Sequence, residues 1–351
     1  MRPAPIELQP TTPLSLRLFD RVPLPAFFAG VAVGLLAFAV FLVYTALFGA
    51  GPGRLAGVAF ANGWLAELVQ DLFLGFSVAV VAASLRGARE ELDALRPALA
   101  PPLCDATDLE LQVFRYPRLP LYAVTLCAVL AAFATAASPR IWASGSLPGW
   151  THPTAIWLVA RSSVAWTLAL RGMVLELVGG LRFSRLAEHV QPVELDGADV
   201  FAPFVRRALR NVSLWMLLTV WMALNFAGRG WAIPSLVWLG IVVLLAFAVT
   251  AFLLPLLGPR RRLRDAKRVE ARRVRAALRG ARDRVLAAPA NEVAGGRLAD
   301  LVAYEARVAN AHEWPIAAST VARFAFYVAL GLGSWVGAGI VQHGIESALR
   351  Q

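Results

Sequence analysis

The sequence predicts an all-α, polytopic membrane helix bundle with about seven transmembrane helices. Of its 351 residues, 58% are hydrophobic and only 16% are charged, which lies outside the usual range of soluble proteins. The hydrophobic residues gather in stretches near the ~20 residues that a membrane-spanning helix requires. These stretches run over 25–48, 62–84, 119–137, 154–179, 212–228, 233–257 and 321–341.

The first six stretches fall into three pairs, and the chain repeats weakly at a spacing of about 90 residues. The segment from Cys104 to Leu109 parallels the segment from Leu195 to Val200, and Arg115 and Arg206 follow at the same offset. Each unit would be an amphipathic lead-in, a span, an external loop and a returning span. Three such units entering from one side form a parallel repeat, although shared composition alone could produce the same similarity.

The basic residues set the expected orientation, because basic loops resist translocation and stay in the cytoplasm. The external loops of this topology carry one arginine each, whereas every internal segment carries several. We therefore expect a bacterial inner-membrane protein with a cytoplasmic N-terminus and an external C-terminus. The expected parts are a six-span bundle over 1–257, a basic cytosolic helical hairpin over 258–315, and a final span with the external C-terminus over 316–351.

Charged side chains inside two of the apolar stretches are the strongest functional lead. Glu67 and Asp71 lie one helical turn apart, on one face of the second span. Arg161 lies at a similar depth in the fourth span, and Arg171 lies further along it, where its stem can reach the inner interface. An isolated ionised side chain at the centre of a spanning helix costs ~2.5–3.5 kcal/mol. We expect either a structural bridge between Asp71 and Arg161, or a substrate or ion pathway through the four residues.

The last span carries small residues at every fourth position, at Ala325, Ala329, Gly333 and Gly337. Such a face permits close helix packing. The same face could line a narrow pore in a homo-oligomer.

Two basic segments are expected to contact anionic lipid head groups. In the segment after Asp199, Arg206, Arg207 and Arg210 lie off the apolar stripe, as in a helix at the inner membrane boundary or a simple elbow before the next span. The second segment holds twelve basic and three acidic residues between Arg260 and Arg284. It would contact lipid, a second copy of the chain or an acidic cytosolic partner, first through Arg260, Arg261, Arg262, Arg264, Lys267 and Arg268. A nucleic-acid partner is not expected, because no recognised binding domain or aromatic platform accompanies the charge.

Catalytic and metal-binding motifs are missing from the sequence. It has no HExxH, no nucleophile elbow, no phosphate-binding glycine loop and no cluster of cysteine and histidine residues. We therefore expect no cofactor or metal, and we do not expect an enzyme. The predicted function is a channel or transporter for an unidentified ion or small solute. The alternative is a membrane sensor or scaffold that recruits a partner through the basic hairpin.

Overall fold

The computed structural model describes residues 25–48, 63–100, 109, 113, 116, 118–136, 153–191, 198–226, 235–287 and 295–349. These residues form eight long helices and no strand longer than one isolated bridge, which confirms the all-α prediction for the described part of the chain. The helices are α2 (Ala26–Phe48), α3 (Gly63–Leu95), α5 (Arg118–Ala136), α6 (Pro153–Leu186), α7 (Ala202–Phe226), α8 (Ser235–Ala287), α9 (Gly295–Asn310) and α10 (Ala318–Leu349). Short 3₁₀ turns follow α3 and α6 (Arg96–Ala98 and Ala187–His189), and another precedes α7 (Ala198–Phe201).

Four of the helical segments are long and apolar enough to cross a membrane, judged over the described residues. They run over Ala26–Phe48, Glu67–Ala98, Ala155–His189 and Val242–Asp283, and a shorter apolar helix covers Leu119–Ala134. This supports the prediction of a membrane protein. The prediction of seven spans goes beyond these four helices.

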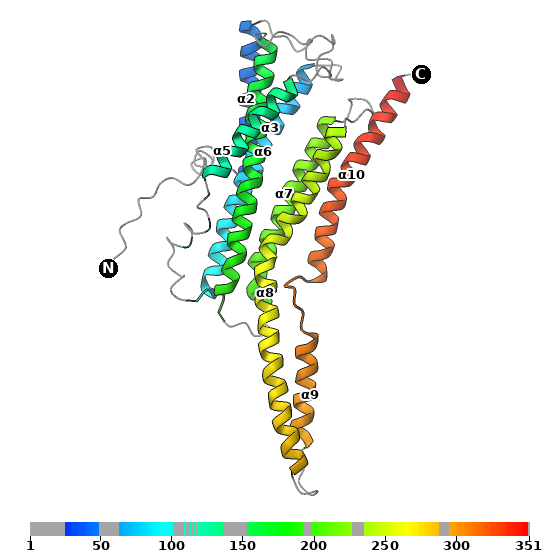
Figure 1. Ribbon diagram of the computed structural model, residues 1–351. Helices are drawn as coiled ribbons and strands as arrows, with labels where there is room; N and C mark the ends of the chain where they lie inside the picture. The colour runs from blue at the N-terminus through cyan, green and yellow to red at the C-terminus, as the bar shows by residue number, and fades with distance from the viewer. Residues whose placement is uncertain are drawn as a thin grey trace, which may run out of the picture.

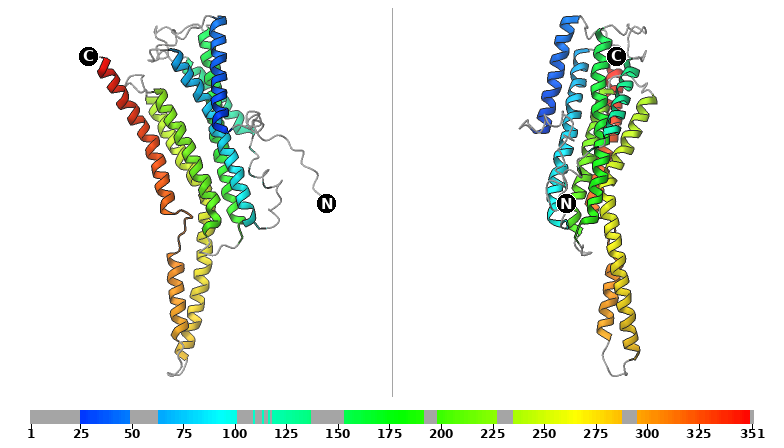
Figure 2. Two further views of the ribbon diagram at one scale, coloured as in Figure 1. Left: turned by 180° about the vertical axis from the view of Figure 1, so that it is seen from behind. Right: turned by 60° about the vertical axis from the view of Figure 1, so that its left-hand side comes forward.

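The helices pack as consecutive antiparallel pairs. α2 lies along α3, α5 along α6, and α7 along α8 (Figure 1). α8 continues well past the other helices, where α9 folds back against it, and α10 then returns beside α7 (Figure 2). α8 therefore runs without a break through the boundary expected at residue 258, and the bundle and the α8–α9 hairpin share one helix.

Glycine residues allow the closest helix crossings. A Cβ atom at Gly75 of α3 would overlap the carbonyl oxygen of Gly30 and lie 2.6 Å from the amide nitrogen of Gly34, both on α2. A Cβ at Gly258 of α8 would overlap the carbonyl oxygen of Ser184 on α6. There the amide of Gly258 donates to Ser184 Oγ at 2.7 Å. Small residues thus let backbones approach, as is common in membrane bundles.

The ends of α3 and α6 are joined by the isolated bridge between Leu99 and Val190. The amide of Ala100 donates to the carbonyl of His189, and the amide of Gln191 donates to the carbonyl of Ala98, each at 2.9 Å. Arg262 Nη2 on α8 also donates to the carbonyl of Val190 at 3.2 Å. These bonds hold three helices together at the end of the bundle from which the hairpin extends.

Contacts between α8, α9 and the segment before α10 hold the hairpin. Arg275 pairs with Glu305 at 3.3 Å. Lys267 Nζ donates to the carbonyl of Ala311 at 2.9 Å. The guanidinium carbon of Arg260 lies 4.3 Å from the ring centroid of Trp314, in a cation–π contact.

Candidate membrane-embedded charged site

A buried ion pair joins α3 and α6. Arg161 Nη1 donates to Glu67 Oε2, and the two side chains are only 8% and 5% exposed. In such a buried pair each charge is balanced by the other, which the hydrocarbon of a bilayer could not do. The predicted link between the second and fourth apolar stretches is therefore present, with a different acid.

Asp71 is the acid that was expected to hold Arg161, and it is not hydrogen-bonded to it. Its side chain is 0% exposed, and neither carboxylate oxygen has a hydrogen-bond partner among the described residues. Arg161 attracts it electrostatically and Glu67 repels it. The site thus holds two buried acids and one base.

Helix geometry explains why Arg161 pairs with Glu67 and not with Asp71. Depth is counted here from Trp64 on α3 and from Trp157 on α6. Arg161 lies four residues beyond Trp157, or ~6 Å along α6 at 1.5 Å per residue. Glu67 lies ~4.5 Å beyond Trp64 on α3, whereas Asp71 lies ~10.5 Å beyond it. The depth of Arg161 matches Glu67 better, and the glutamate side chain is longer by one methylene.

Aromatic residues from α2 cover the same end of α6. The ring of Trp157 lies 5.5 Å from the ring of Phe41 and 5.4 Å from that of Tyr44, measured between centroids. A Cβ at Gly34 of α2 would lie 2.9 Å from the carbonyl oxygen of Asp71, so α2 passes close to the Asp71 backbone. The charged group therefore lies among α2, α3 and α6 in largely apolar surroundings.

The fourth pathway candidate, Arg171, does not join this group. It lies ten residues after Arg161 on α6, which corresponds to ~15 Å along the helix. Its Nε is buried without a hydrogen-bond partner among the described residues. The structure brings together Glu67, Asp71 and Arg161 and leaves Arg171 apart.

The small-residue face of α10 does not pack within the described part of the chain. Ala325, Ala329, Gly333 and Gly337 are all exposed, and a Cβ at either glycine would meet nothing within 4 Å. α10 packs through other residues. A Cβ at Gly331 would lie 2.7 Å from Met216 Sδ of α7, and Phe324 stacks on Phe252 of α8 with 4.3 Å between ring centroids.

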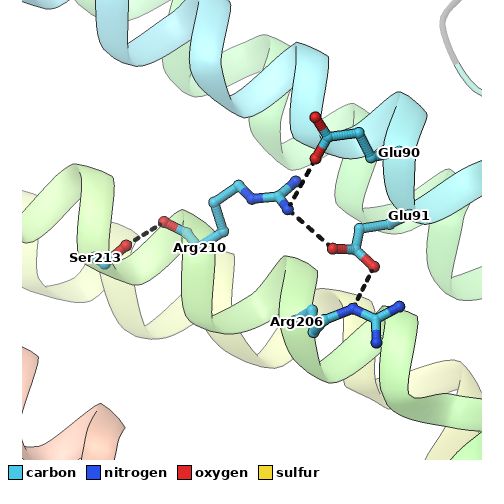
Figure 3. A network of polar contacts seen from close by, with 5 residues as sticks. All are labelled: Glu90, Glu91, Arg206, Arg210 and Ser213. Carbon is cyan, nitrogen blue, oxygen red and sulfur yellow. Dashed lines mark hydrogen bonds and ion pairs between the residues drawn. The ribbon is translucent and has the colours of Figure 1, made fainter. Parts of the chain in front are cut away.

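The arginines at the start of α7 bind acids of α3. Arg206 Nε donates to Glu91 Oε2 at 2.9 Å, and Arg210 Nη2 donates to Glu91 Oε1 at 3.0 Å and to Glu90 at 3.4 Å (Figure 3). Arg206 remains 54% exposed, whereas the Glu91 side chain is 4% exposed. These two arginines, expected at lipid head groups, thus fasten α7 to α3.

Arg207 was expected at head groups as well, and it is buried. It is 2% exposed, and its guanidinium carbon lies 4.7 Å from the ring centroid of Phe183 on α6. Glu176 of α6 interacts with it electrostatically and accepts a hydrogen bond from Ser84 Oγ at 2.5 Å. Sequence analysis missed this buried group. Helical spacing gave a signal, because Arg207 shares a face with the buried residues Phe204 and Asn211.

The basic residues at the start of the hairpin have mixed roles. Arg260, Arg262 and Lys267 make the contacts with Trp314, Val190 and Ala311 described above. Arg268 is 63% exposed beside Asp265, Arg261 is exposed, and Arg264 is partly buried. The first three residues hold the hairpin, and the exposed ones remain able to contact lipid or a partner.

Comparison with known proteins finds no matching family model, no similar curated protein and no similar solved structure. Among the described residues, no group of three or more histidine, cysteine, aspartate or glutamate side chains could hold a metal ion. The geometry of the charged site is therefore the basis for proposing a function.

Proposed function

We propose that this protein is a transporter or channel for an ion or small solute, and that Asp71 takes up and releases a proton during transport. The observation that carries the proposal is the state of Asp71, which is fully buried and has two unpartnered carboxylate oxygens. Its neighbour Arg161 is already bound to Glu67.

An ion pair that only held α3 against α6 would need one acid and one base. Glu67 and Arg161 meet that need, so Asp71 adds a negative charge without an opposite charge to balance it. A buried charge of this kind is costly in apolar surroundings, and protonation removes the cost. Ionisable groups inside membrane spans commonly mark ion pathways and proton relays. Asp71 is placed for such a role.

The proposal includes seven spans, with α5, α7 and α10 completing the four helices named above, in the orientation expected from the basic loops. The bonds between the ends of α3 and α6 support two equivalent units. Leu99 and Val190, the two residues of the isolated bridge at these ends, are separated by 190 − 99 = 91 positions. Cys104 and Leu195 of the weak sequence repeat have the same offset, 195 − 104 = 91. Equivalent residues of two parallel units would thus pair with each other.

The proposal is tested by reconstituting the purified protein in liposomes and measuring the flux of protons and of a panel of ions and small solutes. We expect flux through the wild type and its loss in Asp71→Asn, which keeps the size of the side chain and removes its proton exchange. Asp93→Asn is the matched control, because Asp93 lies on the same helix, with a 59% exposed side chain. Absence of flux across the panel, or equal flux in wild type and Asp71→Asn, would count against the proposal.

A second candidate function, a sensor or scaffold, is favoured by the shape of α8. This helix connects the bundle directly to the α8–α9 hairpin, whose outer arginines stay exposed although each lies beside an acid. The side chains of Arg268, Arg273 and Arg275 are 63%, 75% and 69% exposed. This function predicts that the double variant Arg268→Glu, Arg273→Glu no longer co-purifies with a specific partner protein. Flux through liposomes should stay unchanged. If no partner is lost on charge reversal, the scaffold function fails.

A further inference from the structure

A second group of buried polar side chains lies at the other end of the bundle, near the hairpin. It consists of Tyr116, Glu176, Arg207 and Asn211, and we call it the inner polar group. Their exposures are 6%, 6%, 2% and 2%. Five of their atoms are buried without a hydrogen-bond partner among the described residues: Tyr116 Oη, Glu176 Oε1, Arg207 Nε, Arg207 Nη1 and Asn211 Nδ2.

Gly179 of α6 places these side chains next to one another. A Cβ at Gly179 would lie 2.9 Å from Arg207 Nη2 and 3.6 Å from Tyr116 Oη. Glu176 lies three residues earlier on the same helix, and Asn211 lies one turn after Arg207 on α7, so each shares a face with its neighbour. A Cβ at position 179 would clash with the guanidinium, so glycine there lets the Arg207 guanidinium lie against the α6 backbone, close to the Tyr116 phenol.

Glu176 and Arg207 attract each other, and yet Glu176 Oε1 and two of the guanidinium nitrogens of Arg207 have no hydrogen-bond partner among the described residues. Buried polar atoms are nearly always hydrogen-bonded, so several unbonded ones in one place indicate a bound molecule or ordered water. The chemistry of the atoms distinguishes the two. Four of the five are donors, and the single acceptor belongs to a carboxylate whose other oxygen is already bound by Ser84.

The charge around the group favours an anion. Burial raises the pKa of the Tyr116 phenol, which therefore keeps its proton and can donate it in a hydrogen bond. Arg207, Arg182 and Arg89 act on Tyr116 as positive charges, and Arg210 acts on Arg207 in the same way. Glu176 and Glu91 are the negative charges that act on the group, so the positive charges outnumber them.

We propose that the inner polar group binds a compact inorganic anion of about the size of chloride. The donors are Arg207 Nε and Nη1, Tyr116 Oη and Asn211 Nδ2. A lipid head group is a poor fit, because Arg207 is almost fully buried. Arg206 and Arg210, on either side of Arg207 along α7, are both bound to Glu91 of α3 (Figure 3). The site does not depend on Asp71 or on transport.

Equilibrium binding to the purified full-length protein in detergent tests this site. The protein is prepared in gluconate and titrated with chloride, bromide and inorganic phosphate, and binding is measured by calorimetry and by tryptophan fluorescence. We expect saturable binding of the halides and weak or no binding of phosphate. Tyr116→Phe should weaken halide binding about fivefold, because it removes one hydrogen bond and keeps the ring.

Two further variants keep the test decisive. Gly179→Ala should weaken binding because the new methyl would displace the Arg207 guanidinium. Arg207→Lys should weaken it about tenfold by replacing the fork of donors with a single ammonium. Tyr122→Phe is the matched control, since Tyr122 is 67% exposed on α5. The proposal is overturned if folded wild type shows no saturable halide binding, or if Tyr116→Phe and Arg207→Lys bind like the control. Ordered water alone would then satisfy the group.

Discussion

Arg161 of α6 is bound to Glu67 of α3, and Asp71, one helical turn further along α3, is left with no hydrogen-bond partner among the described residues. One base therefore stands against two acids, all of them buried. The excess acid is what separates this site from a purely structural ion pair, and it makes the three side chains unequal in their expected effects on stability.

Replacing Arg161 should destabilise the protein more than replacing Glu67. In Glu67→Gln the guanidinium can turn to Asp71, whereas Arg161→Gln leaves two buried acids with no base. Removing one member of a buried pair commonly costs about 3–5 kcal/mol, and we expect that range for Arg161→Gln and less than half of it for Glu67→Gln. Thermal unfolding in detergent, monitored by tryptophan fluorescence, measures the loss of stability in each variant. Equal losses of stability in the two variants would show that Asp71 cannot replace Glu67 as the partner of Arg161.

Neighbouring glutamates on α3 should differ sharply when substituted. Glu91 is buried and accepts from both Arg206 and Arg210, whereas Glu90 is 73% exposed and meets Arg210 only at 3.4 Å. We expect Glu91→Gln to loosen the contact between α3 and α7 and to lower the unfolding temperature clearly. Glu90→Gln should change it little, as is usual for exposed ion pairs. A similar drop in both variants would mean that the buried carboxylate is not what fastens α7.

The crossing of α2 and α3 should not tolerate a side chain at Gly75. In Gly75→Ala the new methyl would meet the backbone of Gly30, which cannot move aside as a side chain can, and we expect a loss on the order of 2 kcal/mol. Gly333→Ala on α10 is the matched control, because nothing lies within 4 Å of its Cβ position. The unfolding temperatures of the two variants are compared. If Gly75→Ala leaves the unfolding temperature unchanged, α2 and α3 lie further apart than in this structure.

The contact of Arg260 with Trp314 should control how firmly the hairpin is attached. We expect Arg260→Ala and Trp314→Ala to speed proteolytic cleavage in the segment between α9 and α10, because each removes the same cation–π contact. Arg261→Ala should be cleaved at the wild-type rate, since Arg261 is an exposed neighbour on the same helix. Mapping the fragments by mass spectrometry identifies the cut. Unchanged rates in the first two variants would assign the attachment to the contacts of Lys267 and Arg275 instead.

Composition and hydropathy were enough to predict a helical membrane protein, because a bilayer permits few other ways to bury such long apolar stretches. They also located the buried charges in α3 and α6. The choice of Glu67 over Asp71 depends on side-chain length and on ~6 Å of helix, which a search for charges in apolar stretches does not weigh.

Arg207 shows why the inner polar group was missed. Beside Arg206 and near Arg210 it resembles part of a solvated basic face, and only the packing of α7 against α6 reveals that it points inward, onto Phe183. The small-residue face of α10 shows the opposite difficulty. Its spacing predicts close packing, and it packs on nothing in the described part of the chain, because the contact between α10 and α7 uses Gly331 instead.

The protonation of Asp71 tests the account most directly. Infrared spectra of the protein in lipid, compared between wild type and Asp71→Asn, isolate the carbonyl band of a protonated carboxylic acid at this position, with Asp93→Asn as the control. We predict a band that is present in wild type and in Asp93→Asn, absent in Asp71→Asn, and diminished when a pH gradient drives transport. Wild-type spectra without this band, or with a band that Asp71→Asn retains, would contradict a proton-carrying role for Asp71.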